Sequence, residues 1–154
     1  MSQRARGPTP PTADLRLVQE VAGLVTAMAA RLQANFAAIA AEAGLTATQA
    51  KLLMRLQPSE ALPMRVLAEQ LAYDPSNLTG VVDKLEQRGA VQRRPDPDDR
   101  RVKGLVITAE GVRLRDAFWH RLVGDPGPLG HLNRAQLTRL REALAEALGP
   151  PGDS

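Results

Sequence analysis

The chain has 154 residues and a formal net charge of +3 at pH 7. This length is typical of one domain with a buried core, and because aromatic residues make up only 3%, the core must be built from Leu, Val, Ala and Met. The absence of cysteine excludes disulfides, thiolate metal sites and a cysteine-based oxidation sensor. No apolar run is expected to reach the ~18 residues of a membrane span, and no signal peptide is recognisable, so we expect a cytoplasmic protein.

The N-terminal part is predicted to consist of an arm followed by a long helix. Residues 1–12 contain three prolines and two arginines without an apolar period, which indicates a flexible arm. Residues 13–154 are then expected to form a single domain. Between residues 13 and 43, apolar side chains recur every three or four positions, as in a helix. A helix of about 30 residues suggests packing beyond one small domain.

The next segment predicts a helix-turn-helix. Thr46-Ala-Thr-Gln49 is a capping box, which places the start of a second helix at Thr46, running to about residue 56. A third short helix is expected at about residues 65–72. Asp74 is suited to cap a fourth helix with Pro75 in its first turn, and Gly89 is expected to end it. Two short helices separated by a tight turn form this motif.

After Gly89 the hydrophobic period changes to that of a β-hairpin. Residues 90–94 and 102–108 are strand-like, and the turn-forming segment PDPDDRR lies between them. The fourth helix also places four apolar residues on one face, with spacing i, i+3, i+4 and i+7: Leu78, Val81, Val82 and Leu85. Residues 46–108 therefore predict a winged helix, in which a helix enters a DNA major groove and the hairpin reaches the flanking backbone or minor groove.

Two further helices are predicted at the C-terminal end. Thr108 is suited to cap the fifth, residues 124–130 read as a linker, and Asn133 with Gln136 is suited to cap the sixth. The sixth carries a narrow stripe of Leu137, Leu140, Leu144 and Leu148. We interpret residues 13–43 and 109–148 as dimerisation helices, while packing of the stripe within its own chain stays open. The fold class is mainly α (α+β), a winged helix-turn-helix with long terminal helices.

These elements, in this order, resemble the MarR family of bacterial transcription regulators over nearly the whole chain. The resemblance rests on LTATQAKLLMRL, on VLAEQLAYDPSNLTGVVDKLEQRG and above all on PDPDDRRVKGLVITAEG, which is similar to the family's wing. Asp99-Arg100-Arg101 matches its Asp-x-Arg, and Ile107-Thr108 replaces the usual Leu-Thr. The resemblance implies a homodimer whose terminal helices pair and which binds a palindromic operator in double-stranded DNA, usually to repress transcription. It often also implies release by a small aromatic or phenolic ligand.

Candidate DNA contacts follow from the face of the fourth helix opposite its apolar stripe and from the wing. Asn77 suits adenine, Thr79 suits a thymine methyl or a phosphate, and Asp99 would orient Arg101 for the minor groove. The family often has a basic residue where this chain has Gly80, so Gly80 is either a neutral change or allows close approach to the groove. Lys84, Arg88, Arg93 and Arg94 are expected to contact the phosphate backbone rather than bases. The predicted contacts are Ser76, Asn77, Thr79, Gly80, Lys84, Arg88, Arg93, Arg94, Asp99, Arg100 and Arg101.

The sequence contains few residues that suggest a ligand, metal or catalytic site. Met28, Arg31, Phe36 and Trp119 are candidates to line a ligand cleft, with core or dimer packing as the alternative. Asp116 and His120 are four residues apart, a pair that any helix can contain, so no metal site and no cofactor are expected. No catalytic set or phosphate-binding loop is recognisable, and we expect no enzyme. A winged helix that only contacts proteins is the main alternative to sequence-specific DNA binding.

Overall fold

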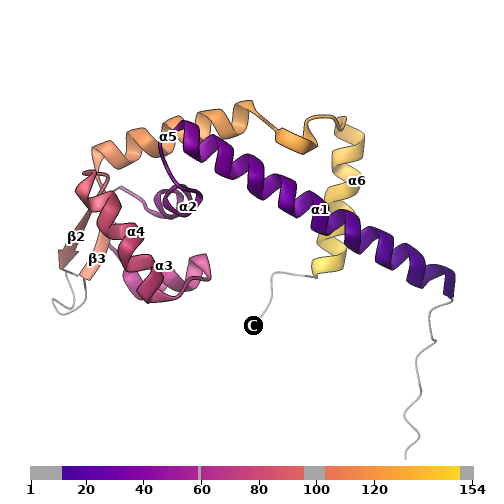
Figure 1. Cartoon of the computed structure of the whole chain (residues 1–154), viewed down its shortest axis with the longest axis horizontal. Helices are drawn as coiled ribbons and strands as arrows, with labels where there is room; N and C mark the ends of the chain where they lie inside the picture. The colour runs from indigo at the N-terminus through magenta and orange to yellow at the C-terminus, as the bar shows by residue number, and fades with distance from the viewer. Residues whose placement is uncertain (1–11, 59, 96–102, 150–154) are drawn as a thin grey trace, which may run out of the picture.

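A computed structural model of the chain describes residues 12–58, 60–95 and 103–149 (Figure 1). The predicted fold class is confirmed, because helices dominate and a small antiparallel sheet lies near one end. The elements in chain order are α1 (Thr12–Glu42), α2 (Ala47–Arg55), β1 (Leu62–Pro63), α3 (Met64–Leu71), α4 (Pro75–Gln87), β2 (Val91–Pro95), β3 (Lys103–Ile107), α5 (Ala109–Gly124), the 3₁₀ turn η1 (Gly127–Leu129) and α6 (Arg134–Leu148).

The helix starts are set by the side chains that the sequence indicated. Thr46 and Gln49 form a reciprocal capping box at α2, and Asn133 and Gln136 form another at α6. Asp74 accepts from the N–H of Ser76 at α4, with Pro75 at its first position, and Thr108 accepts from the N–H of Gly111 at α5. Each cap satisfies backbone donors that have no partner within the helix.

The core lies where the winged helix meets α5 and the C-terminal end of α1. Leu78, Val82 and Leu85 are fully buried, which confirms the predicted inner face of α4, while Val81 is partly buried. Other large buried side chains come from the surrounding elements and include Ile39 of α1, Leu52 and Leu53 of α2, Leu67 of α3, Leu105 and Ile107 of β3, and Phe118 of α5.

The sheet has one more strand than the sequence predicted. Strand β3 is central, and it pairs in antiparallel register with β2 from Val91↔Ile107 to Pro95↔Lys103. It also pairs with β1 through Leu62↔Leu105 and Pro63↔Gly104. A two-residue strand that contains a proline is too short to show a period of two, which explains why β1 was missed.

The predicted linker after α5 also contains structure. Residues 127–129 form the turn η1, which packs against α1. Gly127 has φ +54°, and a Cβ there would lie 2.6 Å from the side-chain nitrogen of Asn35 in α1. The positive φ favours glycine here, and a larger residue would also have to displace the Asn35 side chain.

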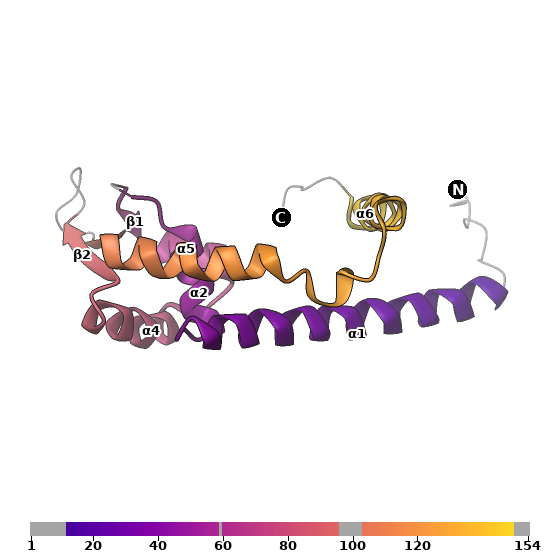
Figure 2. The same cartoon turned by 90° about the horizontal axis from the view of Figure 1, so that it is seen from above.

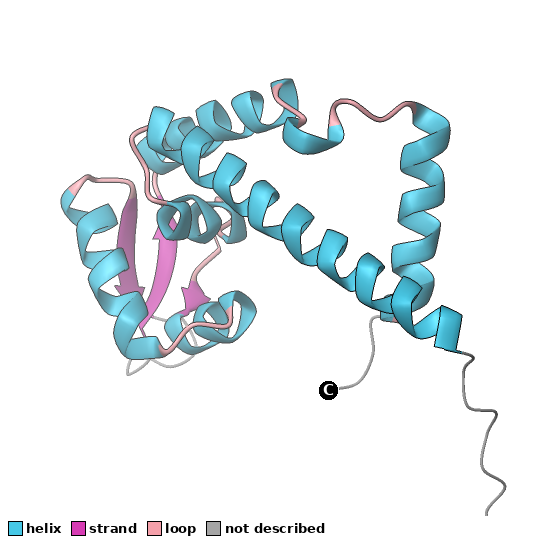
Figure 3. Ribbon diagram, turned by 45° about the vertical axis from the view of Figure 1, so that its right-hand side comes forward, coloured by secondary structure: helices cyan, strands magenta, loops and turns pink. Residues whose placement is uncertain are grey.

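The terminal helices extend away from this core. Helices α1, α5 and α6 form three sides of an open frame, and α6 crosses the middle part of α1, at about residues 21–32 (Figures 2 and 3). No residue of α6 is buried, and Leu24 and Leu148 are 70% and 83% exposed. An apolar groove lies between the two helices, lined by Val21, Leu24, Val25, Met28, Ala29, Leu32, Leu129, Leu140 and Leu144.

One expectation from the sequence is corrected here. Within the described residues, the stretch Asp14–Glu42 is long and apolar enough, by length and composition, to cross a membrane. The expectation failed because scattered polar residues hide the apolar content of this helix from a search for an unbroken run. A helix that packs against other parts of a protein can have the same length and apolar composition.

Candidate nucleic-acid interface and effector cleft

The predicted contact residues of α4 lie together on its exposed side. The first turn of the helix fixes the ones nearest its N-terminus: the N–H of Ser76 donates to Asp74 at 2.8 Å, and its hydroxyl donates to the same carboxylate oxygen. The hydroxyl of Thr79 donates to the carbonyl of Pro75 at 3.1 Å. The exposed set is Ser76, Asn77, Thr79, Gly80, Lys84 and Arg88.

Ser76 has a structural task in addition to any contact with a partner. Its hydroxyl and then its backbone N–H hold the pKa of Asp74 below the ordinary aspartate value. Asp74 is therefore a carboxylate at neutral pH, and it lies at the positive end of the helix dipole. The capping role that the sequence allowed for Ser76 is present, while the side chain of Asn77 makes no hydrogen bond within the described part of the chain.

Gly80 lies in the middle of α4, where a small side chain would meet no other group. A Cβ built there has no other atom within 4 Å, and the residue is exposed. Nothing in the described structure requires a glycine at this position, since its φ is helical. The helix therefore presents bare backbone between Thr79 and Lys84.

The two arginines of β2 have different surroundings. Arg93 forms ion pairs with Asp83, at 2.5 Å, and with Glu86, both on α4, and its side chain is only 26% exposed. The pKa of Arg93 is raised above its ordinary value by the hydrogen bond to Asp83, with the nearby charge of Glu86 adding to it. Arg94 is exposed, and among the described residues it has only a 3.4 Å bond to Gln92.

Arg88, at the end of α4, also makes a contact within the chain. Its guanidinium donates to the carbonyl of Gly44, which lies in the turn between α1 and α2. Two of the predicted phosphate contacts, Arg88 and Arg93, thus use donors to connect α4 to other elements. Lys84 and Arg94 have no ion pair within residues 12–58, 60–95 and 103–149. Asp99, Arg100 and Arg101 lie outside the described residues.

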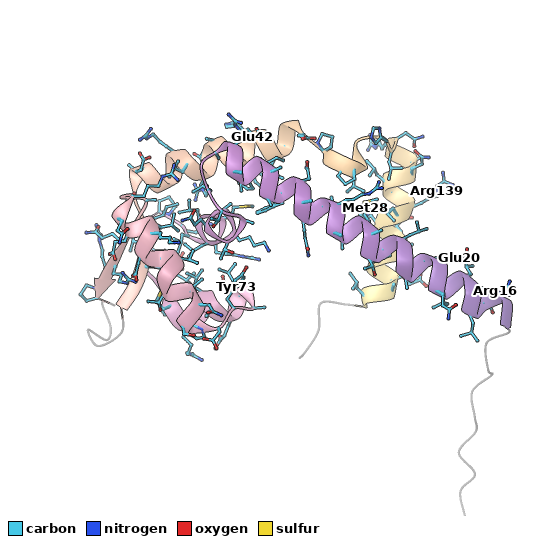
Figure 4. The ribbon with its side chains drawn as sticks, in the orientation of Figure 1. Arg16, Glu20, Met28, Glu42, Tyr73 and Arg139 are labelled. Carbon is cyan, nitrogen blue, oxygen red and sulfur yellow. The ribbon has the colours of Figure 1, made fainter. Side chains whose placement is uncertain are left out.

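The turn before α4 is held by a non-glycine residue in the left-handed region. Ala72, the C-cap of α3, has φ 53°. The neighbouring Tyr73, labelled in Figure 4, shares a hydrogen bond of 3.0 Å with Thr48 of α2. This bond connects α2 to the turn that sets the direction of α4.

The four ligand candidates do not share one cleft in the single chain. Met28 lines the apolar groove where α6 crosses α1 (Figure 4), and Trp119 borders a hollow between α2 and α5 with Met54, Gln57, Arg115 and Asp116. Arg31 lines none of the described hollows. Phe36 lines a cleft of about 420 Å³ between α1, α2 and α3, with Lys51, Met54, Arg55, Gln70 and Leu71.

The Phe36 cleft combines an aromatic ring with cations. Phe36 packs edge-to-face on the buried Phe118 with ring centroids 4.9 Å apart, so part of its role is packing. The ammonium of Lys51 lies 5.9 Å from the Phe36 ring centroid. No acidic residue lines this cleft, and Lys51 and Arg55 have no ion pair among the described residues. Sequence reasoning missed both cations because only the fold places them beside Phe36.

Within residues 12–58, 60–95 and 103–149, no three His, Cys, Asp or Glu side chains are grouped as metal ligands would be. Asp116 pairs with Arg115 instead, at 3.3 Å.

Comparison with known proteins connects this geometry to one family. The sequence model of the MarR family matches residues 45–103. The transcriptional regulator FarR of Neisseria gonorrhoeae is 31% identical over 126 residues, which cover 80% of this chain and 85% of FarR. The organic hydroperoxide resistance transcriptional regulator of Bacillus subtilis is 24% identical, covering 84% and 88% of the two chains. The crystal structure of CouR from Rhodococcus jostii RHA1 bound to p-coumaroyl-CoA aligns with a TM-score of 0.72 and 27% identity, covering 90% of this chain and 98% of CouR.

Proposed function

Since the chain belongs to the MarR family of winged-helix transcription regulators, whose members are not enzymes, we propose that it represses transcription as a homodimer on a palindromic operator. The observation that carries this proposal is the two-sided α4. Leu78, Val82 and Leu85 on its inner face are fully buried, and its outer face presents Asn77, Thr79 and Lys84 beside the wing. Such a helix can enter a major groove without disturbing the core. DNA binding places its action in the bacterial cytoplasm.

The contacts are proposed to divide between base readout and backbone binding. Asn77 is free to bond an adenine edge, and the methyl of Thr79 suits a thymine methyl. Ser76 contributes at the helix N-terminus, and Gly80 gives close approach. Lys84, Arg88 and Arg94 neutralise phosphates, while Asp99 with Arg100 and Arg101 at the wing tip reaches the flanking groove.

The homodimer is supported by the apolar surface of the terminal helices. A monomer would expose Leu24 and Leu148 together with most of the groove between α1 and α6. Apolar patches of this extent usually mark an interface. A second copy related by two-fold symmetry would cover both chains equally and present two equivalent α4 helices. Leu140 and Leu144 line this groove. Replacing both with glutamate would bury two unpaired carboxylates at the interface, so this double variant should dissociate the dimer.

A small aromatic anion is the proposed effector. The Phe36 cleft has a volume in the range of ligand sites, and its aromatic wall and two cations match a ring that carries a carboxylate. CouR was crystallised with p-coumaroyl-CoA, a ligand that combines an aromatic group with negative charge. Lys51→Met should raise the concentration of such an anion needed to release operator DNA. Equal release from the unmodified protein and this variant would exclude the cleft.

A gel-shift titration on the DNA upstream of the chain's own gene tests the proposed function. Asn77→Ala should cost about 1–3 kcal/mol on the operator and little on a random duplex. Equal loss on both would make Asn77 a backbone contact. If no concentration of the unmodified protein shifted any duplex in preference to random DNA, the alternative of a winged helix that only contacts proteins would be favoured.

A further inference from the structure

Arg93 connects the first wing strand to α4 through three hydrogen bonds. Its guanidinium donates to Asp83 with one nitrogen and to Glu86 with the other. Its backbone N–H donates to the second oxygen of Glu86 at 3.2 Å. Asp83 and Glu86 are three residues apart, so both carboxylates face β2 from the same side of the helix.

We propose that Arg93 is a positioning residue that fixes the wing relative to α4, rather than a phosphate contact. The inference rests on the proposed DNA-binding function and names a residue that controls its geometry. Arginine suits this role because its planar fork sets the orientation of both partners, which a lysine ammonium does not. The three bonds join two elements that follow each other through the tight turn at Gly89 and Ala90, where Ala90 N donates to Leu85 O at 2.9 Å.

A fixed angle matters because α4 and the wing contact different parts of the same DNA. If the wing moved freely, binding would have to order it, and that ordering opposes affinity. A connection already present in the free protein removes this cost on DNA whose contact points match the fixed spacing. The effect is specific to the operator, since random DNA is bound through phosphates that tolerate many arrangements.

The charges of Asp83, Glu86 and Arg93 allow two explanations to be separated by whether a substitution raises or lowers the affinity for DNA. Two carboxylates against one guanidinium leave an excess of negative charge on a helix that approaches DNA. Simple electrostatics predicts that removing a carboxylate strengthens binding to all DNA. The positioning role predicts that removing Glu86 weakens binding to the operator, although the protein becomes more positive.

The experiment compares two variants with two matched controls. Glu86→Gln and Arg93→Lys alter the connection with little change in size. Glu69→Gln removes an exposed carboxylate whose partner, Arg65, lies on the same helix α3. Arg113→Lys makes the lysine change at an exposed arginine of α5 whose partner, Glu110, also lies on its own helix. Fluorescence anisotropy gives the dissociation constants for operator and random duplexes across a salt series, and circular dichroism confirms folding.

The positioning role predicts that Glu86→Gln and Arg93→Lys each lower operator affinity about 5- to 30-fold and leave random-DNA affinity unchanged or higher. The double variant should lose no more than the worse single, and the salt slope should not change. Glu69→Gln and Arg113→Lys should stay within about twofold of the unmodified protein.

Two results would overturn the inference. Tighter binding of Glu86→Gln to both duplexes would show that Glu86 only restrains an arginine that binds phosphate. Unchanged binding of Arg93→Lys would show that charge alone is needed. Failure of the proposed function is distinguishable from both, because the unmodified protein would then show no preference for any operator.

Discussion

Replacement of Gly80 by alanine should stabilise the protein and weaken it as a DNA-binding protein. The built Cβ meets no atom within 4 Å, so no clash opposes the gain in helix propensity. Alanine is favoured over glycine inside a helix by about 1 kcal/mol per chain. For a protein of this size, that gain corresponds to a rise in melting temperature of about 2–4 °C.

The opposite effect is expected on the operator. If the bare backbone at Gly80 lies against the groove, an added methyl group separates the surfaces and disturbs the contacts of Thr79 and Asn77. We expect operator affinity to fall about tenfold, which corresponds to about 1.4 kcal/mol, with a smaller loss on random DNA. Differential scanning calorimetry and anisotropy titrations on the same preparation measure both effects.

Gly23 provides the matched control. It also lies inside a helix, α1, with no atom within 4 Å of an added Cβ, and it does not line the groove with α6. Gly23→Ala should give a similar rise in melting temperature with unchanged operator affinity. If Gly80→Ala stabilised the protein and left operator binding intact, the close-approach argument would be refuted and Gly80 would be a neutral change.

Three further changes test the local geometry. Ala72→Gly should stabilise the protein by about 1 kcal/mol, because the left-handed φ of Ala72 strains any residue with a Cβ; a lower urea midpoint would contradict this. Gly111→Ala should destabilise it by about 1–3 kcal/mol or more, because the new Cβ would lie 2.0 Å from the carbonyl oxygen of Ala90, and an unchanged melting temperature would refute that packing. The pKa of Asp74 is lower in the folded protein than its ordinary value near 3.9, so the ionised carboxylate stabilises the folded state at pH values above about 3.9. This contribution is lost as the pH falls through the lower folded-state pKa. Asp74→Asn still caps but does not titrate, so its stability relative to the unmodified protein should be constant above about pH 5 and shift in its favour in acid, as denaturant titrations would show.

The parts of the fold that sequence predicted are those coded by local side-chain chemistry. The caps at Thr46, Asp74, Thr108 and Asn133 act on backbone within three residues, so their spacing is visible in the sequence. The strand β1 and the turn η1 were missed because they depend on distant partners. β1 exists only by pairing with β3, and η1 is held where Gly127 meets Asn35.

The candidate site shows the same division. The exposed face of α4 followed from the apolar period on its other side. The bonds of Glu86 to Arg93 and of Gly44 to Arg88 did not, because only the tertiary fold brings these groups together. The sequence shows that Arg88 and Arg93 are basic, but only the structure shows that both already bind groups within the chain. The grouping of Lys51 with Phe36 is likewise a product of the packing of α1 on α2.

A footprint of the upstream DNA, combined with the mass of the complex by light scattering, tests whether the chain binds an operator as a two-fold dimer. We expect two protected half-sites in inverted orientation, about one helical turn apart, with two chains bound per operator. A single protected half-site occupied by one chain, or binding without any sequence preference, would contradict this expectation.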